Sequence, residues 1–257
     1  MLALKALIFD VDGTLADTER DGHRVAFNRA FEEAKLGWNW SVELYGELLS
    51  VTGGKERILH FLTHHHPDFL KEHQEIGDLN ELIKALHARK THFYTQLLSE
   101  GAIPLRTGVK RLLDEARQQG LRLAIATTTT PANVTALLEN TLGKESIDWF
   151  EVIAAGDIVP AKKPAADIYD YTLEKMKLSA DECIAFEDSS NGIQSSLGAN
   201  LRTVITQNHY TEEHDFTGAA VVLDHLGEPD EACELIAGNM KGASYISMDV
   251  LNQMFSS

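Results

Sequence analysis

Two short stretches of the chain each place a pair of carboxylates directly after an apolar run. The pairs are Asp10 and Asp12 in FDVDGTLADTE, and Glu187 and Asp188 in AFEDSSNGIQ. Gly13 permits a sharp turn that would bring the second carboxylate of the first pair back towards the first. Carboxylate oxygens suit Mg²⁺, which prefers a few such ligands together with waters and a substrate phosphate. The alternative interpretation is local: an Asp-Gly turn in the first stretch and a helix N-cap in the second.

Two further polar residues have types that fit a phosphate site. Thr127 closes the apolar run LRLAIAT, and Lys163 lies in DIVPAKKP. Because Lys163 precedes Pro164, its main chain is held extended, and its ammonium group could reach a phosphoryl oxygen as a point charge. The alternative for Lys163 is a solvated loop lysine. Together, carboxylates, a hydroxyl and an ammonium predict chemistry on a phosphate with a hard divalent cation.

The elements that must position these residues follow from six short apolar runs. The runs are near-continuous rather than alternating, which is typical of strands buried on both faces of a parallel sheet. They span residues 5–10, 121–127, 150–157, 183–188, 202–206 and 219–224. Helical patterns between them predict an α/β fold, a Rossmann-like parallel sheet with helices on both faces. In such sheets ligands bind outside the carboxyl ends of the strands, where all four motifs are expected to meet.

The first interval is much longer than the dozen or so residues that a crossover needs. Its apolar residues recur with helical periodicity over 21–35 and 79–98, which predicts amphipathic helices. We therefore predict a core domain of residues 1–17 and 99–257, with an inserted α-helical cap domain of residues 18–98. The cap is expected over the carboxyl edge of the sheet, because strand 1 ends there.

Composition excludes several classes of function. The net charge of −16 disfavours nucleic-acid binding, and no apolar run reaches the length of a membrane span. Two cysteines in 257 residues indicate a reducing compartment. We expect a monomer that acts on a small molecule, in the cytoplasm or, for a processed organellar form, in the plastid stroma.

The order of these motifs resembles the haloacid dehalogenase superfamily of phosphohydrolases. The motifs are Asp-x-Asp-Gly-Thr, a strand ending in threonine, Lys-Pro and Glu-Asp, and an insertion after the first of them resembles the helical-cap subclass that includes β-phosphoglucomutase. The resemblance implies that Asp10 is a nucleophile forming an aspartyl-phosphate. It implies that Asp12 protonates the leaving oxygen and later deprotonates water, while Thr127 and Lys163 hold the phosphoryl oxygens.

The resemblance also implies the metal site and the substrate. Mg²⁺ would be bound by the side chains of Asp10 and Asp188 and the main-chain carbonyl of Asp12, with Glu187 in support. DVDGTLADTE, ELYGELLSVTGGKERI, RKTHFY and IVPAKKPAADIY together resemble the CbbY group, which implies hydrolysis of xylulose 1,5-bisphosphate, a Rubisco inhibitor, to xylulose 5-phosphate. The implied sugar-bisphosphate residues are Asp17, His23, Tyr45, Gly54, Lys55, Arg57 and Lys90.

Other residues carry predictions of their own. Arg106, near the return to the core, is a candidate ligand of a second substrate phosphate, although any basic residue here could equally be solvated. Thr128 and Thr129 follow Thr127 and are candidates for phosphate or sugar contacts. Thr130 is expected to cap the next helix, with Pro131 in its first position. The histidines of 64–66 are expected to be exposed, and Trp38 and Trp40 to pack inside the cap.

Two alternative functions remain open from the sequence. A hexose phosphomutase of the β-phosphoglucomutase kind would use the same residues but return the phosphate to sugar rather than water. A non-catalytic protein that binds phosphosugars would keep the fold. The intact set of Asp10, Asp12, Thr127, Lys163 and Asp188 argues against the second alternative, because a binding module needs no nucleophile.

Overall fold

The computed structural model describes residues 4–69 and 77–255. The chain forms two compact units. The core unit joins Met1–Asp17 to Pro104–Ser257, and the inserted unit is Thr18–Ile103. The sequence placed the return to the core at residue 99, whereas in the structure a helix runs to Ser99 and the core unit resumes at Pro104.

The core unit is built on one seven-stranded sheet with the order β3-β2-β1-β4-β5-β6-β7. The strands are β1 (Ala6–Phe9), β2 (Arg122–Thr127), β3 (Phe150–Ala155), β4 (Cys183–Glu187), β5 (Arg202–Thr206), β6 (Val221–Leu223) and β7 (Leu235–Gly238). The first six pair in parallel, as predicted. A seventh strand, β7, was not predicted from the sequence, and it pairs antiparallel with β6 at one edge of the sheet.

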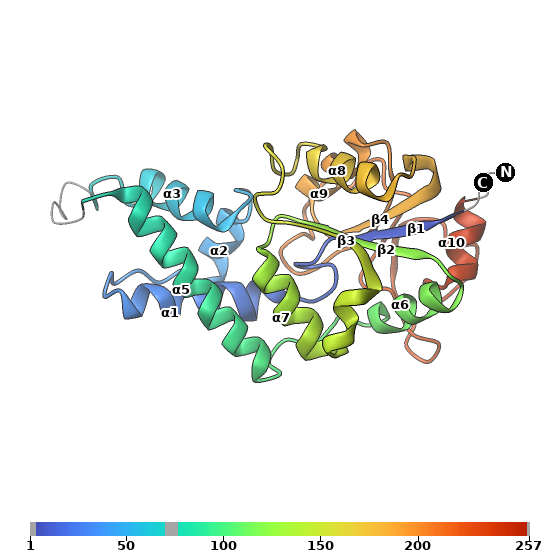
Figure 1. Cartoon of the computed structure of the whole chain (residues 1–257), viewed down its shortest axis with the longest axis horizontal. Coiled ribbons are helices and arrows are strands. Elements are labelled where there is room, and N and C mark those ends of the chain that lie inside the picture. The colour runs from blue at the N-terminus through green and yellow to red at the C-terminus, as the bar shows by residue number, and fades with distance from the viewer. Residues whose placement is uncertain (1–3, 70–76, 256–257) are drawn as a thin grey trace. The chain divides into compact units, whose positions relative to one another are not determined.

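Helices cover both faces of this sheet, as the predicted α/β class requires (Figure 1). Figure 1 shows α8 and α9 on one face and α6 and α7 on the other. The core-unit helices are α6 (Val109–Gln118), α7 (Pro131–Leu142), α8 (Asp167–Met176), α9 (Ser190–Gly198) and α10 (Met248–Phe255), with 3₁₀ turns η2 (Lys144–Trp149) and η3 (Ala180–Glu182). Alternate strand residues serve the two faces. Ala6 and Ile8 pack with Ile168 and Tyr169 of α8.

Within its described residues, the inserted unit has helices and connecting loops but no strand. Its elements are the π-helical turn η1 (Glu19–His23), α1 (Arg24–Glu33), α2 (Val42–Leu48), α3 (Gly54–His64) and α5 (Leu79–Ser99). Trp38 and Trp40 are buried, and both make edge contacts with Phe31 and Phe61, as expected for core tryptophans. The histidines of 64–66 are exposed. Within the residues that the structure describes, no helix is both long and apolar enough to cross a membrane.

Candidate active site

The two carboxylate pairs meet because β1 and β4 are neighbours in the sheet. Asp10 directly follows β1, and its main-chain NH donates to the Phe186 carbonyl oxygen at 3.0 Å, which extends the pairing by one residue. Glu187 ends β4 and Asp188 follows it. Parallel neighbours end at the same edge, so the three acidic side chains lie together there. All three are buried, with at most 7% of each residue exposed.

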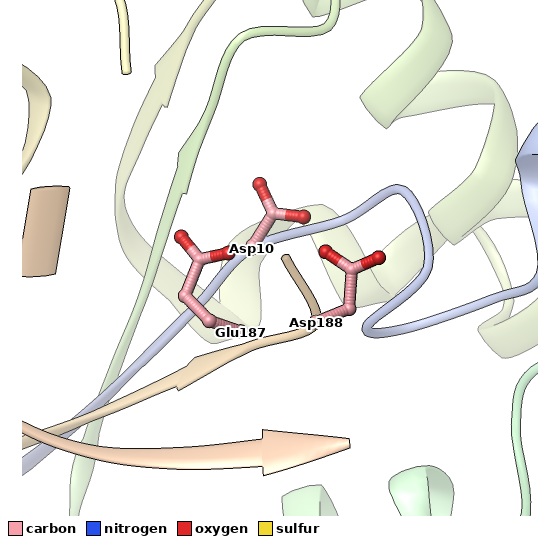
Figure 2. Close-up of side chains that lie close together, drawn as sticks. All are labelled: Asp10, Glu187 and Asp188. Carbon is pink, nitrogen blue, oxygen red and sulfur yellow. The ribbon is translucent and has the colours of Figure 1, made fainter. Parts of the chain in front are cut away.

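These three carboxylates are close enough to share one metal ion. Each offers an oxygen, and the three oxygens lie within 4.8 Å of one another. Figure 2 shows the side chains of Asp10, Glu187 and Asp188 grouped at the ends of the two strands. Among the described residues this is the one group of three or more acidic, histidine or cysteine side chains arranged in this way.

Lys163 joins the same cluster from the loop between β3 and α8. Its Nζ donates to Asp10 Oδ1 and to Glu187 Oε1, each at 2.6 Å, and the residue is 5% exposed. Tyr169 of α8 also donates its hydroxyl to Glu187 Oε1. Glu187 therefore holds Lys163 against Asp10, and the lysine is a buried ion-pair partner rather than a solvated loop residue.

Burial dominates the electrostatics of this cluster. Loss of solvation raises the pKa of Asp10 to about 7, although the Lys163 ammonium opposes that shift. Burial, with the charges of Asp10 and Glu187, also raises the pKa of Asp188 well above its ordinary range. Three carboxylates against one ammonium leave two unbalanced negative charges when these four side chains are ionised. A divalent cation would balance that charge.

One oxygen of Glu187 supports the same conclusion. Glu187 Oε2 is buried and has no hydrogen-bond partner. It faces the first turn of α9, where a Cβ built on Gly192 would lie 1.8 Å from it. An ionised carboxylate oxygen buried without a donor is costly, and a nearby cation would relieve that cost. Oxygen donors of this kind suit a hard ion such as Mg²⁺, so the residues present fit that metal.

Asp12 lies in a tight turn that follows β1. The turn is closed by the Gly13 NH, which donates to the Ala16 carbonyl oxygen at 2.8 Å, and Asp12 itself is half-buried. Gly13 adopts a φ of +86°, a conformation that favours glycine. A Cβ there would also lie 2.1 Å from Asp188 Oδ2, so the absence of a side chain lets this turn approach the acidic cluster.

The four threonines after β2 have different environments. Thr127 ends β2, is buried, and accepts the Thr129 NH at its hydroxyl oxygen at 3.3 Å. Thr129 is buried and accepts a hydrogen bond from Asn133. Thr128 is half-buried. Thr130 caps α7 through the Asn133 NH, with Pro131 in the first turn, which confirms the predicted cap.

The residues predicted to choose the substrate fall mostly in the inserted unit, where they form two buried groups. In one, Lys90 Nζ lies 2.7 Å from His23 Nδ1, above the rings of Phe27 and Tyr94. In the other, Arg57 donates to the Tyr45 hydroxyl oxygen at 2.8 Å, and the Tyr45 hydroxyl donates to Glu19. Gly54 begins α3 and Lys55 follows it, half-buried. Asp17 is exposed in the core unit.

Arg106 takes a different place from the one predicted. Its guanidinium donates to four main-chain carbonyl oxygens, and its Nε lies 3.5 Å from Asp17 Oδ1. The carbonyls belong to Gly13, Thr206, Gln207 and Asp224. These partners use the donors of the side chain, so Arg106 joins loops of the core unit, and we expect no contact between it and a substrate phosphate.

Two residues of this region were missed from the sequence. Tyr169 contacts Glu187, as described above. Asn208, two residues after β5, donates its amide to Asp188 Oδ2 at 2.6 Å. The rule that polar residues at strand ends gather at one edge would have found Asn208, had it been applied to β5. Tyr169 lies within a helix, and no pattern in the sequence indicates its contact.

The raised pKa of Asp10 predicts how its contribution to stability depends on pH. A carboxyl with a higher pKa in the folded state binds more protons there, so its stabilisation is present at low pH and is lost as the pH rises towards about 7. Without metal, the free energy of unfolding of wild type relative to Asp10→Asn should therefore fall between about pH 4 and about pH 7. Urea unfolding in EDTA would measure it, and a constant difference would refute the shift.

The contact between α9 and Glu187 predicts a second result. Gly192→Ala would place a methyl group against Glu187 Oε2, so the glutamate must move and loosen its hold on Lys163. We expect the specificity constant to fall by at least about tenfold. Gly198→Ala, at the end of the same helix, is the matched control, because its new methyl meets only the Ala166 Cβ at 3.2 Å. Equal specificity constants in the two variants would contradict the prediction.

Comparisons with known proteins agree with this geometry. A family model for haloacid dehalogenase-like hydrolases matches residues 4–200. The protein CbbY of Cupriavidus necator is 46% identical over 89% of this chain and 88% of its own length. A crystal structure of a CbbY mutant from Rhodobacter sphaeroides, in complex with xylulose-(1,5)bisphosphate, is 42% identical, with a TM-score of 0.78, over 86% of this chain and 94% of that one.

A more distant comparison bears on the fold alone. The crystal structure of β-phosphoglucomutase from Clostridium difficile has a TM-score of 0.72 at 19% identity, over 98% of this chain and 97% of that one. The fold and the resemblance to this superfamily, with its CbbY members, are thus confirmed. The four motifs meet at one sheet edge, and the family model covers most of the chain: this protein is an enzyme of the haloacid dehalogenase-like hydrolase family, a phosphatase in its reaction class.

Proposed function

We propose that the chain is a Mg²⁺-dependent phosphatase of sugar bisphosphates that works through an aspartyl-phosphate on Asp10. The observation that carries this proposal is the position of Asp10, buried at the end of β1 and paired with Lys163 inside a cluster with excess negative charge. A structural carboxylate would be satisfied by one ion pair. This one shares its lysine with Glu187 and stands beside Asp188.

We propose a reaction in two steps at this edge of the sheet. A carboxylate oxygen of Asp10 attacks phosphorus, and the bond from phosphorus to the sugar oxygen breaks while Asp12 protonates that oxygen. Water then attacks the phosphorus of the aspartyl-phosphate, Asp12 accepts its proton, and the bond to Asp10 breaks to release phosphate. Lys163 and the Thr127 hydroxyl offset charge on the phosphoryl oxygens. This division of labour suits phosphoryl transfer, in which positioning and charge neutralisation supply most of the catalysis.

The metal would be held by the side chains of Asp10 and Asp188 and the main-chain carbonyl of Asp12, with Glu187 in support. When bound, Mg²⁺ would supply the positive charge that an anionic nucleophile needs in order to approach a phosphate dianion. The unpartnered Glu187 Oε2 and the charge imbalance of the cluster support this assignment.

We propose xylulose 1,5-bisphosphate as the preferred substrate, converted to xylulose 5-phosphate. Support comes from the related CbbY protein whose crystal structure holds that bisphosphate. The inserted unit adds buried cationic side chains, Arg57 and Lys90, which fit the recognition of an anionic sugar. The contacts predicted for Asp17, His23, Tyr45, Gly54, Lys55, Thr128 and Thr129 stay predictions, as do the monomeric state and a cytoplasmic or stromal location.

One assay tests the proposal against its alternatives. The purified protein, stripped of metal and then given Mg²⁺, would be offered xylulose 1,5-bisphosphate, ribulose 1,5-bisphosphate and monophosphate sugars. β-Glucose 1-phosphate with a bisphosphate primer would be a separate arm. Phosphate release and sugar-phosphate isomers would both be followed. We expect the highest specificity constant on xylulose 1,5-bisphosphate and no activity in EDTA. Isomer formation without net phosphate release would indicate a mutase, and binding without turnover would indicate a non-catalytic protein.

A further inference from the structure

The side chain of Asn208 contacts one member of the acidic cluster directly. Its Nδ2 donates to Asp188 Oδ2 at 2.6 Å. We propose that Asn208 is a positioning residue, which fixes the Asp188 carboxylate in the orientation needed to bind the metal. This inference rests on the proposed function, because it assumes that Asp188 is a metal ligand.

The hydrogen bond made by Oδ1 fixes the orientation of the Asn208 side-chain amide. Asn208 Oδ1 accepts the Tyr210 main-chain NH at 2.9 Å. The oxygen therefore points into its own loop, and the NH₂ group must face Asp188. An NH₂ group only donates, so it matches an ionised carboxylate oxygen and holds the carboxylate plane. Asp188 Oδ1 accepts no hydrogen bond from a described residue, which leaves it as the freer oxygen for an ion.

The loop that carries Asn208 is tied in place on both sides. The Asn208 NH donates to Thr211 Oγ1, and the Thr211 NH donates to the Asn208 carbonyl oxygen, both at 2.9 Å. The preceding residue, Gln207, donates its NH to the Leu223 carbonyl oxygen at 2.7 Å and accepts Arg106 Nη2 at its own carbonyl at 2.6 Å. A donor fixed in this way is preorganised, so little entropy is lost when it holds its acceptor.

The turn after β1 packs against both Asp188 and Asn208. A Cβ on Gly13 would lie 2.1 Å from Asp188 Oδ2 and 2.7 Å from Asn208 Nδ2, so the Gly13 main chain lies against both groups. Arg106 donates to the Gly13 carbonyl as well as to that of Gln207. The turn with Asp12, the end of β4 and the loop after β5 are thus locked to one another around the Asn208–Asp188 bond.

The expected size of the effect follows from other metal sites. Residues that hydrogen-bond a metal ligand without touching the metal orient that ligand, and losing one typically weakens metal binding by about 10- to 100-fold. Asn208→Leu removes the donor at similar volume. Asn208→Asp replaces it with an acceptor of negative charge beside Asp188, so its effect should be at least as large. His209→Ala is the matched control, because the neighbouring His209 side chain is 67% exposed.

The test is a metal titration without substrate. Full-length protein stripped of metal would be titrated with Mn²⁺ in a calorimeter, with circular dichroism confirming the fold of each variant. We expect the Kd of Asn208→Leu to rise by about 10- to 100-fold and that of His209→Ala to stay near the wild-type value. In a parallel assay, Asn208→Leu should need more Mg²⁺ for half-maximal phosphate release and recover much of its kcat at saturating Mg²⁺.

The outcomes separate the inference from the proposed function. If wild type binds no Mn²⁺, the proposed metal-dependent function fails. If wild type binds Mn²⁺ and folded Asn208→Leu binds it equally well, the positioning role is refuted. If Asn208→Leu does not fold, the Mn²⁺ titration would be repeated with Asn208→Ser, whose shorter side chain cannot reach Asp188 and leaves room in the loop. Unchanged Mn²⁺ affinity in that variant would refute the role in the same way.

Discussion

Replacing Asp10 with asparagine should lower phosphate release by at least about a thousandfold and leave the protein folded. An amide is no nucleophile towards phosphorus, so the aspartyl-phosphate cannot form. The replacement has nearly the same shape, and its amide oxygen can still accept the hydrogen bond from Lys163 that the structure shows at 2.6 Å. Steady-state phosphate release with saturating Mg²⁺ would measure the loss, and thermal unfolding would confirm the fold.

The control for that experiment is Asp230→Asn, which makes the same chemical change at an exposed position of the core unit. It should keep activity near that of wild type. Residual turnover of Asp10→Asn above about a thousandth of wild type would count against Asp10 as the nucleophile. An independent test is to incubate the protein with substrate that is radiolabelled on the transferred phosphate and then to quench in acid. Wild type should carry label on the protein, and Asp10→Asn should not.

Lys163→Met should cost both activity and stability. The substitution removes the ammonium group that pairs with Asp10 and Glu187. Breaking a buried ion pair from one side typically costs about 3–5 kcal/mol, because a buried charge is left uncompensated. Since methionine fills similar volume, we expect a loss of about 3 kcal/mol in the free energy of unfolding near pH 8 without metal. Phosphate release should fall by at least about a hundredfold.

The neighbouring lysine supplies a matched comparison. Lys162 forms an ion pair with Asp157, whose side chain is 58% exposed, so Lys162→Met should change stability by no more than about 1 kcal/mol. The stability deficit of Lys163→Met should shrink as the pH falls, because the abandoned carboxylates become protonated. Urea unfolding of both variants at several pH values would show this trend, and similar deficits at every pH would contradict the buried pairing.

Six of the strands were predictable because strands buried on both faces of a sheet consist almost entirely of apolar residues. Runs such as LRLAIAT are apolar on both faces, and the structure buries β1 and β4 completely. β7 carries no such signal. Its four residues, Leu235–Gly238, are all exposed and end in glycine. Its place in the sheet is set by pairing with β6, a contact between segments that no local pattern encodes.

The residues of the site also include some that the sequence could place and some that it could not. Asp10, Glu187, Asp188 and Lys163 could be placed together because each follows or lies near a strand end, and parallel strands end at one edge. Arg106 was predicted to contact a phosphate because it is a cation near the site, whereas in the structure its donors contact main-chain carbonyls from distant parts of the sequence. Which acceptors a guanidinium finds depends on how loops pack, and residue type alone does not determine that.

The central position of β1 also bears on how the chain folds during its synthesis. β1 pairs with β2 and β4, as in Ala6 with Arg122 and with Cys183. At about 5–20 residues per second, β1 leaves the ribosome on the order of ten seconds before β2 does. The inserted unit, Thr18–Ile103, can fold in that interval, while β1 remains unpaired. β1, which ends beside Asp10, is therefore an apolar segment of the nascent chain that stays without its sheet partners for about that time.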